Sequence, residues 1–462
     1  MNTNPIIDEV KINRLLIKNT AEDYAKIKDI LDKALEGNGL ELDEVAHLTT
    51  IQNDNLTQEL FNAACQVKQK IYGSRIVIFA PLYISNLCAN ECLYCAFRAS
   101  NHKLNRKYLT TQEIQDETIK LIAQGHKRIL LVAGESYPAQ GFDYLLEAIN
   151  TIYQTGSDQE KIRRINVNVA PLDNHQYRLL KESKIGTYQL FQETYHLKTY
   201  QQVHLAGKKA DYHWRISAFD RAIKAGIDDV GMGVLFGLAN WRFELLALLE
   251  HANYLQQTFG VGPHTISVPR IEPAVGSELS LNPTSPVSDR DFCKIVAILR
   301  LAIPYTGVIM STRENPILRK QTLALGVSQI SAGSRTNPGG YSDHQTKNDA
   351  QFSLGDHRTL AEVVAELASL GYLPSFCTSC YRLGRTGLSF MKLAKSGAIK
   401  QKCNPNALIT FAEYLHNYAT YETKTVGNAL IENELAKLPL SLKKNISDAI
   451  KNLIEHQTET IV

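Results

Sequence analysis

The chain has 462 residues, of which 44% are hydrophobic and 21% are charged, a balance typical of globular proteins with a sizeable core. Its formal net charge is +3 and its lysines and arginines are spread along the chain, which gives no reason to expect a nucleic-acid partner. The opening residues, MNTNPIIDEV, lack the pattern of a signal peptide, and no apolar run approaches the roughly 18 residues that cross a bilayer. We therefore expect a soluble, cytoplasmic protein without membrane contact, whose 8 cysteines serve metal binding or catalysis and not disulfides.

Residues 1–72 predict an N-terminal helical region. Segments such as AEDYAKIKDILDKALEG and LTQELFNAACQVKQKIYG place apolar residues at three- and four-residue spacing, the period of an amphipathic helix. No chemistry is visible in this region. Cys65 lies in one of these helical patterns and Cys293 in a later one, so both are predicted to be small core residues.

Short apolar segments alternate with amphipathic stretches over residues 73–340. The candidate strands are 75–85, 128–135, 164–171, 187–194, 229–237, 264–273, 307–313 and 328–336. Eight β/α units of this kind predict a closed parallel (β/α)8 barrel of the TIM type. An open, doubly wound sheet would show the same alternation, but eight repeats without a glycine-rich nucleotide fingerprint favour closure.

The chain changes character after the barrel. Residues 337–356 (NPGGYSDHQTKNDAQFSLGD) are polar and rich in turn formers, which predicts a linker or surface loop. A helical C-terminal domain, residues 341–462, is expected beyond the barrel, and it contains three further cysteines.

Cys88, Cys92 and Cys95 form a C-x3-C-x2-C run directly after the first strand. The loops that follow the strands build the active-site face of a barrel, so the three thiolates are expected to converge there. Thiolates suit iron–sulfur clusters, and three ligands on a [4Fe-4S] cube leave one iron open to a cofactor or substrate. The alternatives are a structural zinc site that lacks its fourth ligand and unrelated buried thiols.

This run resembles the signature of the radical S-adenosylmethionine (SAM) superfamily, including the aromatic Tyr94 before the last cysteine. The resemblance implies a [4Fe-4S] cluster whose open iron binds SAM, and cleavage of SAM by the reduced cluster to methionine and a 5′-deoxyadenosyl radical. The further SAM contacts that the resemblance implies lie near strand ends: Ala133, Gly134, Glu135, Asn168, Glu193 and Tyr195. Ala133 stands where the superfamily often has glycine, and Asn168 and Glu193 have an alternative interpretation as satisfied polar residues of the barrel.

Cys377, Cys380 and Cys403 form a second run, C-x2-C-x22-C, in the C-terminal region. A zinc ribbon needs four ligands, and the C-terminal region has neither a second C-x2-C pair nor a nearby histidine pair. A dithiol redox site would have no use for Cys403. Three cysteines without an obvious fourth ligand favour an open iron–sulfur site, with structural zinc as the alternative.

The two cysteine runs together resemble the radical SAM tyrosine lyases that mature [FeFe]-hydrogenase. The segments FQETYH, GVGPHTISVPR, QISAGS and CYRLGRTG also resemble that family, and the match covers nearly the whole chain. The resemblance implies removal of a hydrogen from the amino nitrogen of L-tyrosine and cleavage of its Cα–Cβ bond, which gives p-cresol and dehydroglycine. Dehydroglycine is then converted to carbon monoxide and cyanide at the second, auxiliary cluster. The implied partners are a reductant such as ferredoxin or flavodoxin and other hydrogenase maturation proteins.

The resemblance also implies roles for individual residues. The second cysteine run binds the auxiliary cluster, and His264 is our choice for the ligand of an extra iron at the far end of the barrel, with a strand-capping histidine as the alternative. The carboxylate of tyrosine needs a cationic partner. Arg313 and Arg270 are the best-placed arginines, and Ser311 or Thr312 could supply hydroxyl contacts.

Two rival functions remain open. The 2-iminoacetate synthase of thiamine biosynthesis shares the barrel, and the second cysteine run would then be a zinc or vestigial site. A non-catalytic iron–sulfur scaffold is the rival of another class, but it has no need of an open-iron triad on the catalytic face of a barrel.

Overall fold

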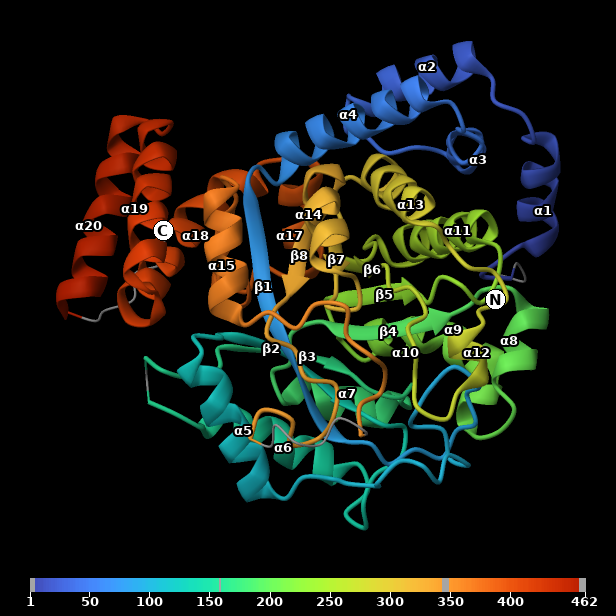
Figure 1. The fold of residues 1–462 in the computed structure, drawn as a ribbon, viewed down its shortest axis with the longest axis horizontal. Coiled ribbons are helices and arrows are strands. Elements are labelled where there is room, and N and C mark those ends of the chain that lie inside the picture. Colours follow the sequence, from blue (N-terminus) through green and yellow to red (C-terminus); the bar gives the residue numbers. More distant parts are fainter. Residues whose placement is uncertain (1–4, 158, 343–348, 457–462) are drawn as a thin grey trace.

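A closed barrel of parallel strands forms the centre of the computed structural model, which describes residues 5–157, 159–342 and 349–456 (Figure 1). Each strand pairs with the next along the chain, and β8 pairs with β1 to close the ring. The predicted (β/α)8 barrel is therefore confirmed. Its strands are β1 (Arg75–Ser85), β2 (Arg128–Ala133), β3 (Arg164–Asn168), β4 (Tyr188–Glu193), β5 (Val230–Val234), β6 (Thr265–Ser267), β7 (Gly307–Met310) and β8 (Val327–Ser331).

β6 is the strand that departs most from its predicted range, 264–273. Its ladder ends at Ser267, and Pro269 and Pro273 follow. Proline has no backbone N–H and cannot donate to a ladder. Beyond Ser267 the regular ladder is lost, and an isolated bridge between Arg270 and Phe236 keeps the segment beside the end of β5. Several residues of this segment line the cavity described below.

The helices that follow the strands wrap the outside of the barrel (Figure 1). A short 3₁₀ helix at Lys208–Ala210 precedes α9. The α-helices are α5 (Thr111–Ala123), α6 (Asp143–Gln154), α7 (Asn174–Glu182), α8 (Leu197–Val203), α9 (Tyr212–Ile216), α10 (Ala218–Lys224), α11 (Trp241–Phe259), α12 (Glu278–Leu281), α13 (Asp289–Ala302) and α14 (Pro316–Leu325).

The N-terminal region is helical, as predicted, and covers the barrel along α11, α13 and α14 (Figure 1). Its helices are α1 (Glu9–Lys18), α2 (Tyr24–Ala34), α3 (Leu42–Leu48) and α4 (Asp54–Ile71). α13 is buried from Phe292 to Ala302 because α4 packs on its outer face. Cys293 is a buried core residue, as predicted, but the prediction for Cys65 is wrong, because this residue lies on the exposed face of α4.

The C-terminal region joins the barrel through β9 (Leu373–Ser375), which pairs in parallel with residues 75–77 at the start of β1. The residues that follow β9 therefore lie at the amino end of the barrel. α18 packs on β9, α19 and α20, and the last two helices project to one side of the barrel (Figure 1). The helices of this region are α15 (Leu360–Ser369), α16 (Ser379–Arg382), α17 (Gly387–Lys395), α18 (Ile399–Tyr418), α19 (Tyr421–Ala436) and α20 (Leu440–His456).

The described residues of the predicted linker or surface loop, 337–356, form no helix or strand, but part of the segment is buried and does not lie on the surface. Residues 337–341 are buried, and the carboxylate of Glu117 accepts hydrogen bonds from the backbone N–H groups of Tyr341 (3.0 Å) and Ser342 (2.7 Å). Gln351 and Phe352 are partly buried and return to the barrel mouth. Residues 343–348 of the predicted loop lie outside the described part of the chain.

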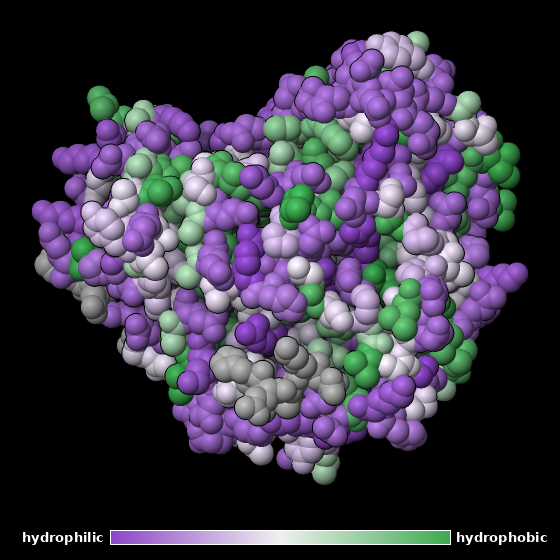
Figure 2. All heavy atoms as spheres, in the orientation of Figure 1, coloured by the Kyte–Doolittle hydropathy of each residue, from purple (hydrophilic) through white to green (hydrophobic). Residues whose placement is uncertain are grey.

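The face shown in Figure 2 is mostly hydrophilic, with apolar residues in small groups. Within the described residues, no helix combines the length and the hydropathy that crossing a membrane requires.

Candidate active site

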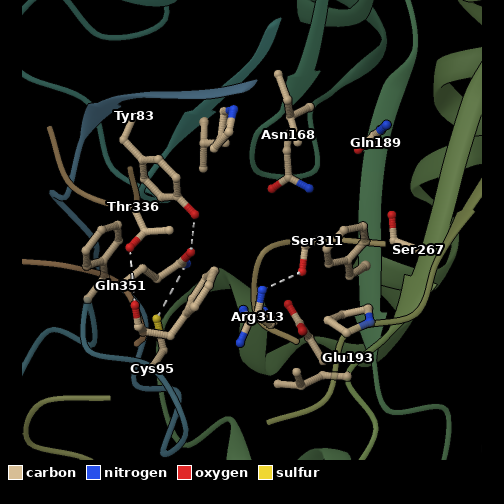
Figure 3. A pocket seen from close by; sticks show the side chains of 18 of the residues that line it. Tyr83, Cys95, Asn168, Gln189, Glu193, Ser267, Ser311, Arg313, Thr336 and Gln351 are labelled. Carbon is tan, nitrogen blue, oxygen red and sulfur yellow. Dashed lines mark hydrogen bonds between the residues drawn. The ribbon is translucent and has the colours of Figure 1, made fainter. Parts of the chain in front are cut away.

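A cavity of about 170 Å³ opens at the carboxyl ends of the barrel strands (Figure 3). Its wall takes residues from the strand ends and from the loops that follow them. Cys88, Cys92 and Cys95 all line it, together with Tyr94. The structure therefore brings the first cysteine run together at the mouth of the barrel.

The loop that carries these cysteines is held against the segment that follows β4. The N–H of Glu91 donates a hydrogen bond to the carbonyl oxygen of Ala206 at 3.0 Å. The hydroxyl of Tyr94 lies 2.8 Å from Nε2 of His204. These contacts fix the backbone of the loop beside the cavity.

Burial makes the three thiols of this loop weak acids. It raises the pKa of Cys95 to about 11, with Cys88 adding to the shift, and it also raises the pKa of Cys88 and of Cys92. Neighbouring buried thiols become thiolates together when cations compensate them, as the irons of a cluster do. Among the described residues, no three cysteine, histidine or carboxylate side chains converge on one point as a single metal ion requires. A cubane cluster does not need that convergence, because each thiolate binds a different iron.

A buried network of two carboxylates and two cations lies beside the thiols. Nζ of Lys209 lies 2.7 Å from Oε1 of Glu193, and Nη1 of Arg215 lies 2.9 Å from Oε1 of Glu135. Nδ2 of Asn90 donates a hydrogen bond to the other oxygen of Glu135 at 2.7 Å. Burial opposes ionisation, but Arg215 and Lys209 hold the pKa of Glu135 below its usual value. The network therefore places two paired carboxylates at the edge of the cavity.

Lys209 and Arg215 are lining residues that the sequence analysis missed. They lie in the 3₁₀ helix and in α9, among other polar residues of the stretch after β4. The available signal is indirect: buried carboxylates at strand ends need cationic partners. That requirement does not say which of the many lysines and arginines of the chain supply them.

Most of the predicted SAM contacts line the cavity, but Tyr195 does not. Its side chain is fully buried behind the mouth, and its hydroxyl lies 2.9 Å from Nδ1 of His251. The cause is the turn after β4, where Glu193 takes a positive φ of 71° and redirects the chain. The predicted contacts that do line the cavity are Tyr94, Ala133, Gly134, Glu135, Asn168 and Glu193.

Ser311, Thr312 and Arg313 line the same cavity, whereas Arg270 does not. The guanidinium of Arg270 forms a bidentate pair with Glu314, in which Nε lies 2.9 Å from Oε1. A further hydrogen bond of 2.8 Å joins Arg270 to Asp289. These carboxylates hold Arg270 outside the cavity.

Gln351 and Phe352 reach the cavity from the segment after β8, and they too were missed by the sequence analysis. Nε2 of Gln351 lies 3.8 Å from Sγ of Cys95, and its Oε1 accepts a hydrogen bond from the hydroxyl of Tyr83 at 2.7 Å (Figure 3). The guanidinium of Arg313 lies 3.2 Å from the centre of the Phe352 ring. This segment therefore covers part of the mouth beside the cysteine loop.

Cys377, Cys380 and Cys403 come together at the opposite, amino end of the barrel. Cys377 follows β9, Cys380 lies in α16 and Cys403 lies in α18. A hydrogen bond between Cys380 and Cys403 raises the pKa of Cys380 and lowers that of Cys403. Oγ of Ser379 lies 3.2 Å from Sγ of Cys377.

Cations surround this second cysteine run. Nη2 of Arg128 donates a hydrogen bond to the carbonyl oxygen of Cys377 at 2.7 Å, and the charges of Arg75 and Arg385 act on the thiol of Cys403. In the described part of the chain, the Nε atoms of these three arginines are buried without a hydrogen-bond partner. Guanidinium groups with unused N–H donors around three thiols suit a negatively charged iron–sulfur cluster.

His264 lies beside the second cysteine run. Its Nε2 is 3.2 Å from the hydroxyl of Tyr381, the residue after Cys380, and its ring centre is 4.1 Å from that of Phe390. Nδ1 lies 3.4 Å from Oδ1 of Asp229 but outside hydrogen-bonding geometry. The histidine is therefore at the predicted end of the barrel, where Nε2 faces Tyr381 and Nδ1 faces the buried carboxylate of Asp229.

Comparisons with known proteins relate the barrel and the segment that follows it to two families. Residues 82–249 match the Radical SAM superfamily, and residues 267–373 match the Biotin and Thiamin Synthesis associated domain. The 2-iminoacetate synthase of Escherichia coli (strain K12) is 33% identical over 345 residues, which are 74% of this chain and 89% of that protein.

Two solved structures share the fold of nearly the whole chain. The crystal structure of HydG, a maturase of the [FeFe]-hydrogenase, matches with a TM-score of 0.95 and 44% identity, covering 99% of this chain and 100% of the other. The structure of the maturase HydG from Carboxydothermus hydrogenoformans matches with a TM-score of 0.84 and 44% identity, covering 97% and 98%.

Proposed function

Because this chain belongs to the radical SAM superfamily and, within it, to the family of the [FeFe]-hydrogenase maturase HydG, we propose that it is a tyrosine lyase with two iron–sulfur clusters. It cleaves the Cα–Cβ bond of L-tyrosine to give p-cresol and dehydroglycine. Dehydroglycine is then converted to carbon monoxide and cyanide for assembly of the hydrogenase active site. The protein works in the cytoplasm with a reductant such as ferredoxin or flavodoxin and with other hydrogenase maturation proteins.

The first cysteine run holds the [4Fe-4S] cluster at the carboxyl mouth and leaves one iron open for SAM. When bound, this cluster supplies the electron that cleaves SAM to methionine and the 5′-deoxyadenosyl radical. Glu135, Glu193 and Asn168 line the cavity beside the cysteines and serve the polar groups of SAM. Lys209 and Arg215 hold the two carboxylates in place through the ion pairs described above.

The tyrosine substrate lies in the same cavity. Arg313 binds its carboxylate, and Ser311 and Thr312 contribute hydroxyl groups. Phe352 and Gln351 cover part of the mouth and help to exclude water, which a primary carbon radical requires.

The second cysteine run holds the auxiliary iron–sulfur cluster at the amino end of the barrel. Arg75, Arg128 and Arg385 compensate its negative charge. His264 binds the extra iron through a ring nitrogen. When bound, these metal centres supply the chemistry that breaks dehydroglycine down to carbon monoxide and cyanide.

The observation that carries this proposal is the pair of cysteine triads at opposite ends of one barrel. A lyase that only makes 2-iminoacetate for thiamine biosynthesis needs the first cysteine triad but not the second. Similarity to the E. coli synthase extends over 74% of this chain, whereas the match to the HydG structure extends over 99%. We therefore favour the hydrogenase maturase over the thiamine enzyme and over a non-catalytic scaffold.

Metal and product analysis of the Cys380→Ser variant tests the proposal. The anaerobically reconstituted wild-type protein is expected to hold about eight or nine irons, and the variant about four. With SAM, dithionite and tyrosine, the variant should still release p-cresol but little carbon monoxide or cyanide. Cys65→Ser is the matched control, because Cys65 is exposed and belongs to neither cysteine run. Wild-type protein that binds four irons, or that forms p-cresol without either diatomic product, would overturn the proposal.

A further inference from the structure

The charged residues that line the cavity fall into two groups. Its carboxylates are Glu135, Glu193 and Glu272, and its cations are Lys209, Arg215 and Arg313. Lys209 and Arg215 are ion-paired with Glu135 and Glu193. Among the described residues, Glu272 and Arg313 have no ion pair. The cavity thus contains one carboxylate, of Glu272, and one guanidinium, of Arg313, that are not ion-paired within the described residues.

Arg313 is held in place without being neutralised. Its guanidinium lies 3.2 Å from the centre of the Phe352 ring, and Nη1 donates only a long hydrogen bond of 3.5 Å to the carbonyl oxygen of Arg270. Burial lowers its pKa, but a guanidinium remains charged in proteins. The remaining N–H donors are available to a ligand.

Glu272 lies on the neighbouring segment, between Ile271 and Pro273 after β6. The N–H of Ile271 donates a hydrogen bond to the carbonyl oxygen of Phe236 at 2.9 Å, which fixes the backbone next to Glu272. Within the described part of the chain, no hydrogen bond or ion pair engages the Glu272 carboxylate. Its neighbour Arg270 is committed to Glu314 and does not neutralise it.

The charges around Glu272 set its acidity. Burial raises the pKa of Glu272 to about 7; Glu314 adds to the rise, and Arg313 and Arg270 oppose it. Arg313 in turn faces Tyr83, Glu193 and Cys95 across the cavity. A carboxylate of this acidity exchanges protons near neutral pH.

We propose that Glu272 binds the ammonium group of the substrate and accepts its proton, while Arg313 binds the carboxylate of the same α-amino acid. This inference rests on the proposed function and adds to it the base of the reaction. An α-amino acid carries its two charges on adjacent groups, and Glu272 and Arg313 are close enough to influence each other but are not paired. The zwitterion pairs with both residues at once, its ammonium group with Glu272 and its carboxylate with Arg313.

The proton transfer balances without an oxidant or reductant. One N–H bond of the ammonium group breaks, an O–H bond forms on the carboxylate of Glu272, and the electron pair stays on nitrogen. The neutral amine that results is the form from which a carbon radical can take a hydrogen atom. Glu272 is thus a catalytic residue that prepares the amine, and it lines the cavity from the segment that follows the short β6 ladder.

Ligand binding tests the recognition step without turnover. L-Tyrosine and 3-(4-hydroxyphenyl)propanoate, which lacks the amino group, are titrated into the reconstituted protein in the presence of SAM. Wild-type protein should prefer tyrosine by about tenfold or more, and Glu272→Gln should lose that preference while keeping its affinity for the propanoate. Glu278→Gln is the matched control, because Glu278 is an exposed carboxylate a short way along the chain, at the start of α12. An unchanged preference in Glu272→Gln would overturn the inference.

The pH dependence of p-cresol formation tests the proton transfer. In wild-type protein kcat/KM should rise with pH through about 7 and then level off, because Glu272 must be ionised to accept the proton. In Glu272→Gln the rate should be at least about 100-fold lower at pH 7 and should keep rising towards pH 9, as free amine becomes available from solution. A variant with wild-type rate and profile would overturn the inference. Wild-type protein that forms no p-cresol would instead contradict the proposed function, and the two failures are distinguishable.

Discussion

At the scale of single residues, buried charge is concentrated where the cavity needs it. Glu135 and Glu193 sit at strand ends, and each has a cation within 3 Å. Removing one partner of such a buried pair leaves the other uncompensated in a medium of low dielectric constant. The network should therefore matter for stability as well as for cofactor binding.

Replacing Lys209 by methionine tests this network. We expect the free energy of unfolding to fall by about 3 kcal/mol, because Glu193 loses its closest cation while the side-chain volume is kept. SAM should also bind more weakly. Urea unfolding and equilibrium dialysis with labelled SAM measure the two effects. Lys208→Met is the control, since Lys208 is exposed, and it should change neither quantity. Equal behaviour of the two variants would contradict the prediction.

The sequence predicted cysteines better than it predicted charged partners. Spacing alone identified both cysteine runs, because a cluster requires several thiolates at fixed intervals. Lys209 and Glu272 were missed, since a buried charged residue looks the same in sequence as a solvated one. Arg270 was chosen for its position within the predicted strand 264–273, but Glu314 holds it away from the cavity.

At the scale of elements, the turn after β4 shows how a helix supports the site. Glu193 has a positive φ, which is strained for a residue with a side chain. The carboxylate of Glu244, in α11, accepts hydrogen bonds from the hydroxyl of Thr194 and from the N–H of Tyr195, the latter at 2.8 Å. Because Glu244 is fully buried, burial raises its pKa to about 7.

The pH dependence of stability should carry the signature of Glu244. Its folded-state pKa lies above the ordinary value of 4.5, so the native protein binds this proton more tightly than the unfolded chain. The free energy of unfolding should therefore fall as pH rises from 4.5 to 7, by about 3 kcal/mol from this group.

Glu244→Gln should remove that part of the pH dependence, because glutamine does not titrate. Urea unfolding at pH 5 and pH 8 measures it, with Glu182→Gln on the exposed side of α7 as the control. If the free energy of unfolding of Glu244→Gln still differs between pH 5 and pH 8 as it does in the wild-type protein, Glu244 does not cause the difference and the prediction is wrong.

Strand positions were predicted closely, but strand ends were not. The amino ends of the strands are within one residue of the prediction, because buried apolar runs begin there. The predicted carboxyl ends are too long for β2 to β8. Beyond these ends the backbone leaves the ladder, and its residues line the cavity or the loops around it. Their apolar and polar pattern resembles that of a strand, so the sequence does not show where each ladder stops.

At the scale of the whole molecule, the two cysteine runs occupy opposite ends of the barrel. The first follows β1 at its carboxyl end, and the second follows β9, which pairs with the start of the same strand. The barrel could be predicted from its eight repeats. The link through β9 could not, because a strand of three residues carries too little pattern to be recognised.

The cations at the amino end should tune the auxiliary cluster. Arg128→Gln removes a positive charge beside Cys377, which should destabilise the more negative, reduced state of the cluster. We expect its reduction potential to fall by tens of millivolts, of the order given by one charge at short range. Redox titration followed by electron paramagnetic resonance measures the shift. Arg178→Gln, an exposed arginine in α7, is the control. A potential that rises or stays constant in Arg128→Gln would contradict the assignment of a cluster to this site.

The pairing of β1 with β2, β8 and β9 has a consequence for biogenesis. On the ribosome, β1 and the loop with Cys88, Cys92 and Cys95 emerge early, whereas β8 and β9 emerge only after most of the chain has been translated. The early thiols thus belong to a nascent sheet that is not yet a ring. The thiols of Cys377, Cys380 and Cys403 emerge after all eight barrel strands have been translated. The barrel around the first cysteine run can therefore close only after β8 has been translated.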